Sequence, residues 1–162
     1  MTFDVQKTQE YDNAKPHELI AQRIIMHANN VQVIEDDDTP ERPDYQKSWF
    51  DFRTSDQITY EVKQDSRSIN TGNFFIAGMQ SFKNETYKAY CGICKTKADY
   101  YMLLFGNEFY KIDTDILIGL LLAGTYKVTR YWNKRGDVIY GMLLPVKHVK
   151  PFAEVYSISG FE

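Results

Sequence analysis

Two carboxylic acids and a lysine, Asp51, Glu61 and Lys63, have the types and spacing that could support attack of water on a phosphate ester. Two carboxylates held about 4 Å apart would repel each other by roughly 1 to 4 kcal/mol, so a cation is expected between them. Mg²⁺ (or Mn²⁺) suits this position because it takes oxygen ligands, and the backbone carbonyl of Val62 would add a third oxygen. Lys63 would orient or deprotonate the attacking water and offset charge in the transition state. These residues predict metal-assisted hydrolysis.

A β-hairpin at residues 48–64 is predicted to position these side chains. Apolar and polar residues alternate with a period of two on both sides of a turn at residues 54–57. The apolar residues occupy even positions, and Asp51, Glu61 and Lys63 occupy odd ones. Keeping the apolar residues on one face requires cross-strand pairs such as 52 with 60 and 50 with 62, and therefore a loop of odd length. The same register predicts Asp51 opposite Glu61, with Cβ atoms about 5 Å apart.

The simplest alternative is that Glu61 and Lys63 are ordinary solvent-facing residues of a half-exposed strand. Most Glu-x-Lys triplets arise in this way, so the triplet alone is no evidence for a site. Its value increases because Asp51 lies ten residues upstream on the facing strand, on the same side as Glu61. The three residues together favour chemistry over surface decoration.

The arrangement of Asp51, Glu61, Val62 and Lys63 resembles the PD-(D/E)-x-K signature of restriction-endonuclease-like nucleases. In that family an aspartate starts one strand of a hairpin, the acid-x-lysine motif lies on the next strand, and an upstream helix often supplies another acid. Glu18 matches this helical acid and by resemblance joins the catalytic residues. A glutamate in a first helical turn is, however, also favoured by the helix dipole alone.

The first acid of the signature has two candidates. The literal proline-aspartate dipeptide is Pro43-Asp44, whereas Asp51 follows Phe50. Members of the family often lack the proline, and Asp51 lies within the alternating strand, so it is the preferred metal ligand. Asp44, in a loop, stays as the alternative.

The resemblance covers roughly residues 16–112, and the segments at residues 64–65, 71–76 and 95–100 are similar to small phage-type or resolvase-like members. It implies a restriction-endonuclease-like α/β fold, with a central mixed β-sheet flanked by helices. It also implies Mg²⁺- or Mn²⁺-dependent hydrolysis of DNA phosphodiester bonds.

Basic residues in the second half of the chain are candidates for DNA contact. The formal charge of −3 argues at first against a nucleic-acid partner, but residues 1–82 hold 8 basic and 14 acidic residues (net −6), while residues 83–150 hold 11 and 6 (net +5). An acidic metal site with a basic substrate track would produce this separation, as would a merely solvated surface. Lys95, Lys97 and Arg130 are the predicted contacts, and the resemblance favours Lys97. Aromatic residues that could stack on bases are Tyr126, Tyr131 and Trp132.

Local patterns predict a helix, several strands, a second helix and further strands, which indicates an α/β protein around a mixed sheet. The first helix is expected at residues 16–28, with Pro16 in its first turn, and the second at residues 115–123, capped by Asp113 or Thr114. Beyond the hairpin, strands are expected at residues 31–34, 72–77, 100–105, 108–112, 126–132 and 138–144, with an acidic loop at residues 35–40.

Length and composition favour one domain, spanning residues 1–162, with its own hydrophobic core. The longest apolar stretch, residues 116–123, is far short of the roughly 20 residues that span a bilayer, so no membrane segment is expected. The N-terminus lacks the basic start and apolar run of a secretory signal, which favours the cytoplasm, that of the host for a phage protein. Cys91 and Cys94 lack the second cysteine pair that a zinc site needs, so two free thiols are expected.

Two other classes of function stay open. A non-catalytic DNA-binding or regulatory protein of phage type could keep the nuclease fold, although the presence of Asp51, Glu61 and Lys63 argues against it. A plain interaction module would show no affinity for Mg²⁺ or Mn²⁺. A homodimer would allow both strands of a duplex to be cut, but no pattern in the sequence requires one.

Overall fold

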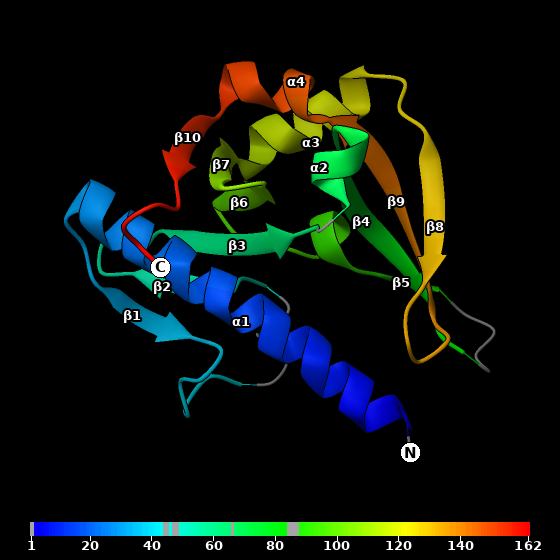
Figure 1. Ribbon diagram of the computed structural model, residues 1–162, viewed down its shortest axis with the longest axis horizontal. Helices are drawn as coiled ribbons and strands as arrows, with labels where there is room; N and C mark the ends of the chain where they lie inside the picture. The colour runs from blue at the N-terminus through cyan, green and yellow to red at the C-terminus, as the bar shows by residue number, and fades with distance from the viewer. Residues whose placement is uncertain (1, 44–45, 47–48, 66, 84–87) are drawn as a thin grey trace.

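A computed structural model describes the chain at residues 2–43, 46, 49–65, 67–83 and 88–162 (Figure 1). Asp44, the alternative first metal ligand, and Ser48, the first residue of the predicted hairpin, lie outside the described residues. The preferred ligand, Asp51, lies within them. The geometry of the site can therefore be followed for Asp51.

Within the described residues the strands form two β-sheets, and the larger is a six-stranded mixed sheet. Its strands, in spatial order, are β1 (Val33–Asp36), β2 (Phe52–Thr54), β3 (Thr59–Gln64), β6 (Tyr100–Phe105), β7 (Glu108–Asp113) and β10 (Glu154–Ser157). Neighbours are antiparallel except β3 and β6, which run parallel. The predicted mixed sheet is therefore confirmed.

The second sheet, counted over the same residues, has four antiparallel strands. In spatial order they are β5 (Lys88–Tyr90), β4 (Asn73–Ser81), β9 (Val138–Pro145) and β8 (Val128–Trp132). Sequence patterns indicated three of these strands but not that they form a separate sheet. Alternation shows where a strand lies and which face is apolar, whereas its partners depend on tertiary packing.

The first helix, α1 (Thr2–Asn29), is longer than the helix predicted at residues 16–28. Pro16 lies inside it, so the expectation of a helix that starts at Pro16 was wrong. An interior proline removes one backbone hydrogen bond and usually disturbs a helix. Residues 2–15 contain no glycine and no further proline, so nothing else in this segment stops the helix.

The helix α3 (Thr114–Ala123) begins one residue before the predicted start at Asp115 and ends where it was predicted to end. Asp113 is its N-cap, and the Asp113 carboxylate accepts hydrogen bonds from the amides of Asp115 and Ile116. The short helical segments are α2 (Ser68–Thr71), η2 (Gly92–Cys94), α4 (Val146–Val149) and η3 (Lys150–Phe152). No helix in the described part of the chain is long and apolar enough to cross a membrane.

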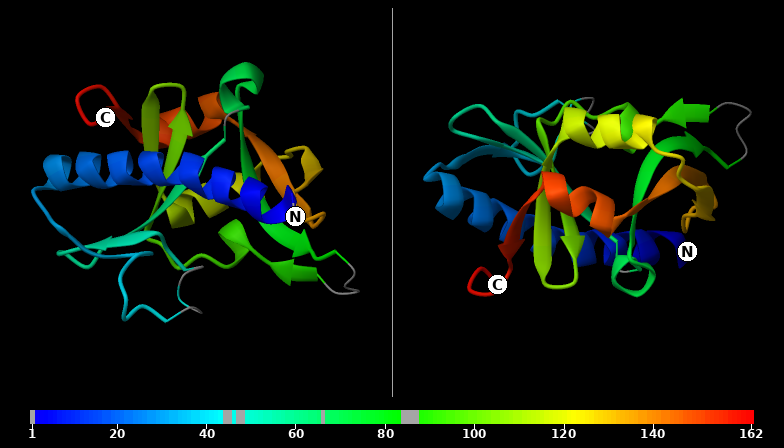
Figure 2. Two further views of the ribbon diagram at one scale, coloured as in Figure 1. Left: turned by 60° about the horizontal axis from the view of Figure 1, so that its bottom comes forward. Right: turned by 90° about the horizontal axis from the view of Figure 1, so that it is seen from above.

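Helix α1 covers one face of the larger sheet, and α3, α4 and the second sheet lie on the other (Figure 2). Strand β6 contributes to both cores because successive side chains point to opposite faces. Met102 and Leu104 pack with α1, whereas Tyr101 and Leu103 pack with the second sheet and α3. The central sheet is therefore flanked by helices, as predicted.

The β2–β3 hairpin, which carries the predicted site, has the predicted pairing of residues 52 and 60, whereas the predicted pairing of residues 50 and 62 is not part of its regular register. Phe52 pairs with Tyr60 and Arg53 pairs with Thr59. An odd number of residues, 54–58, therefore separates the last pair, as the apolar pattern required. The even-numbered Phe52 and Tyr60 are buried against α1, which leaves the odd-numbered face of β3 for the interior between the two sheets.

Candidate metal and catalytic site

Asp51 lies at a bend directly before β2 and is bound to β3 through its backbone and its side chain. Its amide donates to the carbonyl of Tyr60 (2.8 Å), and its carboxylate accepts a hydrogen bond from the amide of Val62 (2.6 Å). Regular pairing of the hairpin starts one residue later, at Phe52. The expected pairing of Asp51 with Glu61 is therefore not part of the regular register, because the bend directs the carboxylate to the β3 backbone.

Three carboxylates from different elements meet beside this bend. Glu18 comes from α1, Asp37 follows β1, Asp51 precedes β2, and one oxygen of each lies within 4.8 Å of the others. We refer to these residues as the carboxylate triad. The triad lines a pocket of about 240 Å³, which is also lined by Lys15, Val62, Lys63 and Gln64. An all-oxygen ligand set of this kind fits Mg²⁺ or Mn²⁺.

Asp37 was not predicted as a site residue, because the sequence placed it in the acidic loop at residues 35–40. Strand β1 runs antiparallel to β2 with Asp36 opposite Phe52. The residue that follows β1 therefore lies beside the residue that precedes β2, which brings Asp37 to Asp51. The acidic run showed that carboxylates are concentrated here, but only the pairing of the two strands selects Asp37.

The charge of the triad is only partly balanced by its neighbours. Burial and the nearby Asp51 raise the pKa of Glu18 to about 7, although Lys15, 3.2 Å away, opposes the shift. Burial and Asp51 also raise the pKa of Asp37 to about 6, against the opposing effect of Arg42 at 3.1 Å. A bound divalent cation would relieve the repulsion and release these protons.

Arg42 anchors the segment between Asp37 and Asp51 from inside the protein. Its buried side chain donates to the Asp37 carboxylate (3.1 Å) and to the Asp51 carbonyl (3.2 Å). It also donates to the carbonyls of Gln46 (2.9 Å) and Phe50, and its guanidinium lies 4.1 Å from the Phe50 ring centroid. No sequence pattern distinguishes this arginine, because the tertiary path of the segment sets its partners.

Glu61 and Lys63 form an ion pair on the face of β3 that points away from α1. Oε1 of Glu61 lies 2.5 Å from Nζ of Lys63, and the Glu61 side chain is only 9% exposed. Burial raises the pKa of Glu61, while Lys63 opposes this shift. Burial lowers the pKa of Lys63, but the carboxylates of Glu61 and Asp51 outweigh this effect and raise it overall. Lys63 therefore keeps its positive charge at neutral pH.

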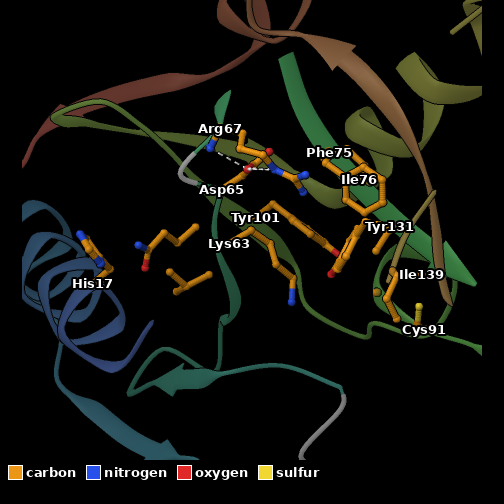
Figure 3. Close-up of a pocket in the computed structure, with 14 residues that line it drawn as sticks. His17, Lys63, Asp65, Arg67, Phe75, Ile76, Cys91, Tyr101, Tyr131 and Ile139 are labelled. Carbon is orange, nitrogen blue, oxygen red and sulfur yellow. Dashed lines mark hydrogen bonds and ion pairs between the residues drawn. The ribbon is translucent and has the colours of Figure 1, made fainter. Parts of the chain in front are cut away.

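Lys63 connects two neighbouring pockets. It lines the triad pocket, and it also lines a larger pocket of about 760 Å³ between the two sheets, into which Figure 3 shows its side chain pointing. Asp51 belongs to the triad, whereas Glu61 is engaged with Lys63. The structure thus places the four predicted catalytic residues in one region, with Asp51 and Glu18 on one side and Glu61 and Lys63 on the other. Val62 gives its amide to Asp51, and its carbonyl stays a predicted ligand.

Lys97 lies close to the Asp51 bend. Its amide donates to the carbonyl of Trp49 (2.8 Å), and its ammonium lies 3.7 Å from the centroid of the Trp49 ring. Lys95, which follows η2, is exposed two residues earlier. Lys97 is therefore placed beside Trp49, two residues before Asp51, whereas Lys95 is exposed at the end of η2.

Arg130 has a different position from the two lysines. It is exposed on β8, with its guanidinium 5.2 Å from the Trp132 ring centroid, whereas Tyr131 lines the larger pocket. Successive residues of a strand point to opposite faces. Arg130 therefore points away from this pocket, and the structure does not bring it to the site.

Cys91 and Cys94 are free thiols, as expected. Cys91 lines the larger pocket, and burial raises the pKa of its thiol. Across the part of the chain that the structure describes, the carboxylate triad is the one group of three metal-ligating side chains so close together. The two cysteines therefore do not form a zinc site with other described residues.

Comparison of the chain with protein-family models, with curated proteins and with solved structures found no match. No relative therefore supplies a function, and the assignment depends on fold and site geometry. These define a mixed α/β protein in which three carboxylates that could hold a cation lie next to an ion pair between the buried Glu61 and the exposed Lys63.

The stability of the protein is expected to depend on pH through Glu18 and Asp37. In the unfolded chain both acids have pKa values near 4, whereas in the folded protein these are about 7 and about 6. Between about pH 4 and 7 the folded state therefore binds more protons than the unfolded state, and the free energy of unfolding falls as the pH rises. In EDTA we expect a decrease of about 1 to 3 kcal/mol across this range, measured by urea unfolding.

Glu18→Gln is expected to remove much of this decrease, because the variant has no acid to deprotonate at that position. Glu108→Gln, at an exposed position on β7, serves as the control and should keep the wild-type pH dependence. Mg²⁺ should raise stability mainly at the high end of the range. An unchanged slope in Glu18→Gln would contradict the raised pKa.

Proposed function

We propose that this protein is a metal-dependent nuclease of the PD-(D/E)-x-K type that hydrolyses DNA phosphodiester bonds. The observation that carries the proposal is the meeting of the carboxylate triad and the charged Lys63 at one pocket. Metal-assisted hydrolysis of a phosphate ester requires oxygen ligands for the metal and benefits from a nearby positive charge such as a lysine. The chain order of a helical acid, an aspartate at a strand start and a Glu-x-Lys strand agrees with the family resemblance.

The triad residues, Glu18, Asp37 and Asp51, would hold Mg²⁺ or Mn²⁺. A divalent ion bound there supplies positive charge that polarises the phosphate and lowers the pKa of water. The raised pKa values of Glu18 and Asp37 fit this role, because the mutual repulsion that contributes to them disappears when a cation binds. Glu61 and the carbonyl of Val62, the other ligands predicted from the sequence, lie next to the triad on β3.

Lys63 acts in this proposal as a fixed positive charge. Its pKa is raised by Glu61 and Asp51, so the amine is protonated and unsuited to accept a proton from water. An ammonium at this place orients the attacking water through hydrogen bonds and stabilises the extra negative charge on the phosphate in the transition state. Glu61 holds the lysine in position through the 2.5 Å contact.

DNA would approach along the edge that carries Lys95 and Lys97. Lys97 is held against Trp49, close to Asp51, where its charge can contact a backbone phosphate next to the one that is cut. Lys95 is exposed nearby. Arg130 is not part of the proposed interface, because it lies on the opposite face of β8 from the pocket residue Tyr131.

The test is cleavage of labelled single-stranded, duplex and branched DNA in Mg²⁺, Mn²⁺ or EDTA. Asp51→Asn removes one carboxylate of the triad, and Asp115→Asn removes the same charge from an exposed position in the first turn of α3. We expect cleavage that requires a divalent metal, is retained in Asp115→Asn and is lost in Asp51→Asn.

Two other results would each contradict the proposal. DNA binding without cleavage in any metal would favour the non-catalytic DNA-binding or regulatory protein. Absence of both DNA binding and calorimetric heat with Mg²⁺ or Mn²⁺ would favour a plain interaction module.

A further inference from the structure

The larger pocket, of about 760 Å³, lies between β3 and β6 of the larger sheet and β4, β8 and β9 of the second sheet (Figure 3). Its volume is within the range of pockets that bind small organic ligands. Lys63 and Tyr101 line it from the larger sheet, and Phe75 and Tyr131 line it from the second sheet. Because Lys63 also lines the triad pocket, a ligand in the larger pocket would lie directly beside the proposed catalytic site.

Tyr101 places a buried polar group in this pocket. Its side chain is 1% exposed, and its hydroxyl has no hydrogen-bond partner among the residues that the structure describes. The Thr96 hydroxyl donates to the carbonyl of Trp49 (3.0 Å) and accepts from the amide of Ala98 (3.1 Å). A buried hydroxyl without a partner is unfavourable and calls for an explanation. A bound ligand with a polar edge would supply the missing partner.

The wall of the pocket formed by the second sheet carries two aromatic rings, and an arginine lies at its edge. The rings of Tyr131 and Phe75 pack edge to face with centroids 5.2 Å apart. The guanidinium of Arg67 lies 5.5 Å from the Tyr131 centroid, and its side chain is 66% exposed at the pocket mouth, where Asp65 lies 3.8 Å from it. Nucleic-acid bases stack on aromatic rings, and arginine contacts their phosphates. The wall therefore has the chemistry of a nucleotide site.

We propose that the larger pocket binds one unstacked nucleotide of the DNA strand that is cut, so that the substrate is single-stranded DNA or a strand separated from its duplex. This proposal rests on the proposed nuclease function. The base stacks on Tyr131 and places its polar edge at the Tyr101 hydroxyl, while Arg67 meets the backbone phosphate at the mouth. Lys63 then faces the phosphate at the boundary between the two pockets. A base inside a duplex reaches such a pocket only by leaving its stack.

The test is binding of a fluorescent single-stranded oligodeoxynucleotide and of its duplex, measured by anisotropy in EDTA, where metal-dependent cleavage does not occur. The wild-type protein is expected to bind the single strand more tightly. Tyr131→Leu should weaken single-strand binding about 5- to 100-fold through loss of stacking, and Tyr101→Phe about 3- to 10-fold through loss of one hydrogen bond. Duplex binding should change little in both variants.

Trp132→Leu is the matched control, because Trp132 is the next residue on β8, is 61% exposed and lies on the opposite face from Tyr131. It should leave single-strand binding unchanged. Tyr101→Phe removes only a hydroxyl without a partner, so it should keep the thermal stability of the wild type. Its effect on single-strand binding therefore tests the proposal even if Tyr131→Leu lowers the stability of the protein.

Three outcomes would overturn the proposal: no preference of the wild type for the single strand, unchanged binding in Tyr131→Leu and Tyr101→Phe, or an equal loss in Trp132→Leu. Any of them counts against the nucleotide pocket even where metal-dependent cleavage is observed. The expected binding pattern without cleavage would instead support the pocket while contradicting the proposed nuclease function.

Discussion

Lys63→Met is expected to lower the rate of metal-dependent DNA cleavage by about 10²- to 10⁴-fold. The variant lacks the ammonium that lies 2.5 Å from Glu61 and lines the triad pocket. It therefore loses the positive charge proposed to stabilise the phosphate in the transition state. Single-turnover cleavage at saturating Mg²⁺ measures the effect on the chemical step.

The pH profile of this variant separates a direct role of Lys63 from one exerted through Glu61. Lys63 lowers the pKa of Glu61, so its removal raises that pKa further. If Lys63 acted only by keeping Glu61 deprotonated, a high pH would deprotonate Glu61 in the variant as well, and cleavage would recover. We expect the loss to persist, because the charge itself is needed at the phosphate. Lys147→Met, at an exposed position on α4, is the control, and wild-type activity in Lys63→Met would remove Lys63 from the mechanism.

Arg42→Met is expected to lower the free energy of unfolding by about 3 to 5 kcal/mol. The substitution leaves the Asp37 carboxylate without its 3.1 Å partner. It also leaves the carbonyls of Gln46, Phe50 and Asp51 without the hydrogen bonds that the guanidinium donates. Because total stabilities of proteins are about 5 to 15 kcal/mol, this loss is a large fraction. Urea unfolding in EDTA measures it without a contribution from bound metal.

Arg53→Met, on β2, provides a matched control. Arg53 pairs with Glu35 (2.9 Å), and its guanidinium lies 5.2 Å from the same Phe50 ring, but its side chain is 32% exposed. Water can replace part of what the variant loses, so the expected cost is about 1 kcal/mol or less. Equal losses in the two variants would contradict the anchoring role of Arg42. The affinity of folded Arg42→Met for Mg²⁺ should also fall, because Asp37 and Asp51 lose the group that positions them.

Local sequence patterns determined the hairpin that carries Asp51, Glu61 and Lys63. Period-two alternation on each side of a short turn requires one apolar face, and this requirement set the register of Phe52 with Tyr60 that the structure has. The N-cap of α3 was narrowed by sequence to Asp113 or Thr114, and the structure selects Asp113, whose carboxylate accepts from amides two and three residues away. The start of α1 was not predictable, since a proline marks a possible first turn without excluding a longer helix.

Only the tertiary structure decided how the site is completed. Asp37 reaches Asp51 because β1 pairs with β2, and Arg42 supports both acids because its guanidinium donates to the Asp37 carboxylate and to the Asp51 carbonyl. The larger pocket likewise exists only because a second sheet packs against β3 and β6. Sequence periodicity reports the face on which a side chain lies, since this follows from its immediate neighbours along the chain. Which distant face it meets depends on the packing of the whole core, and no local pattern encodes that choice.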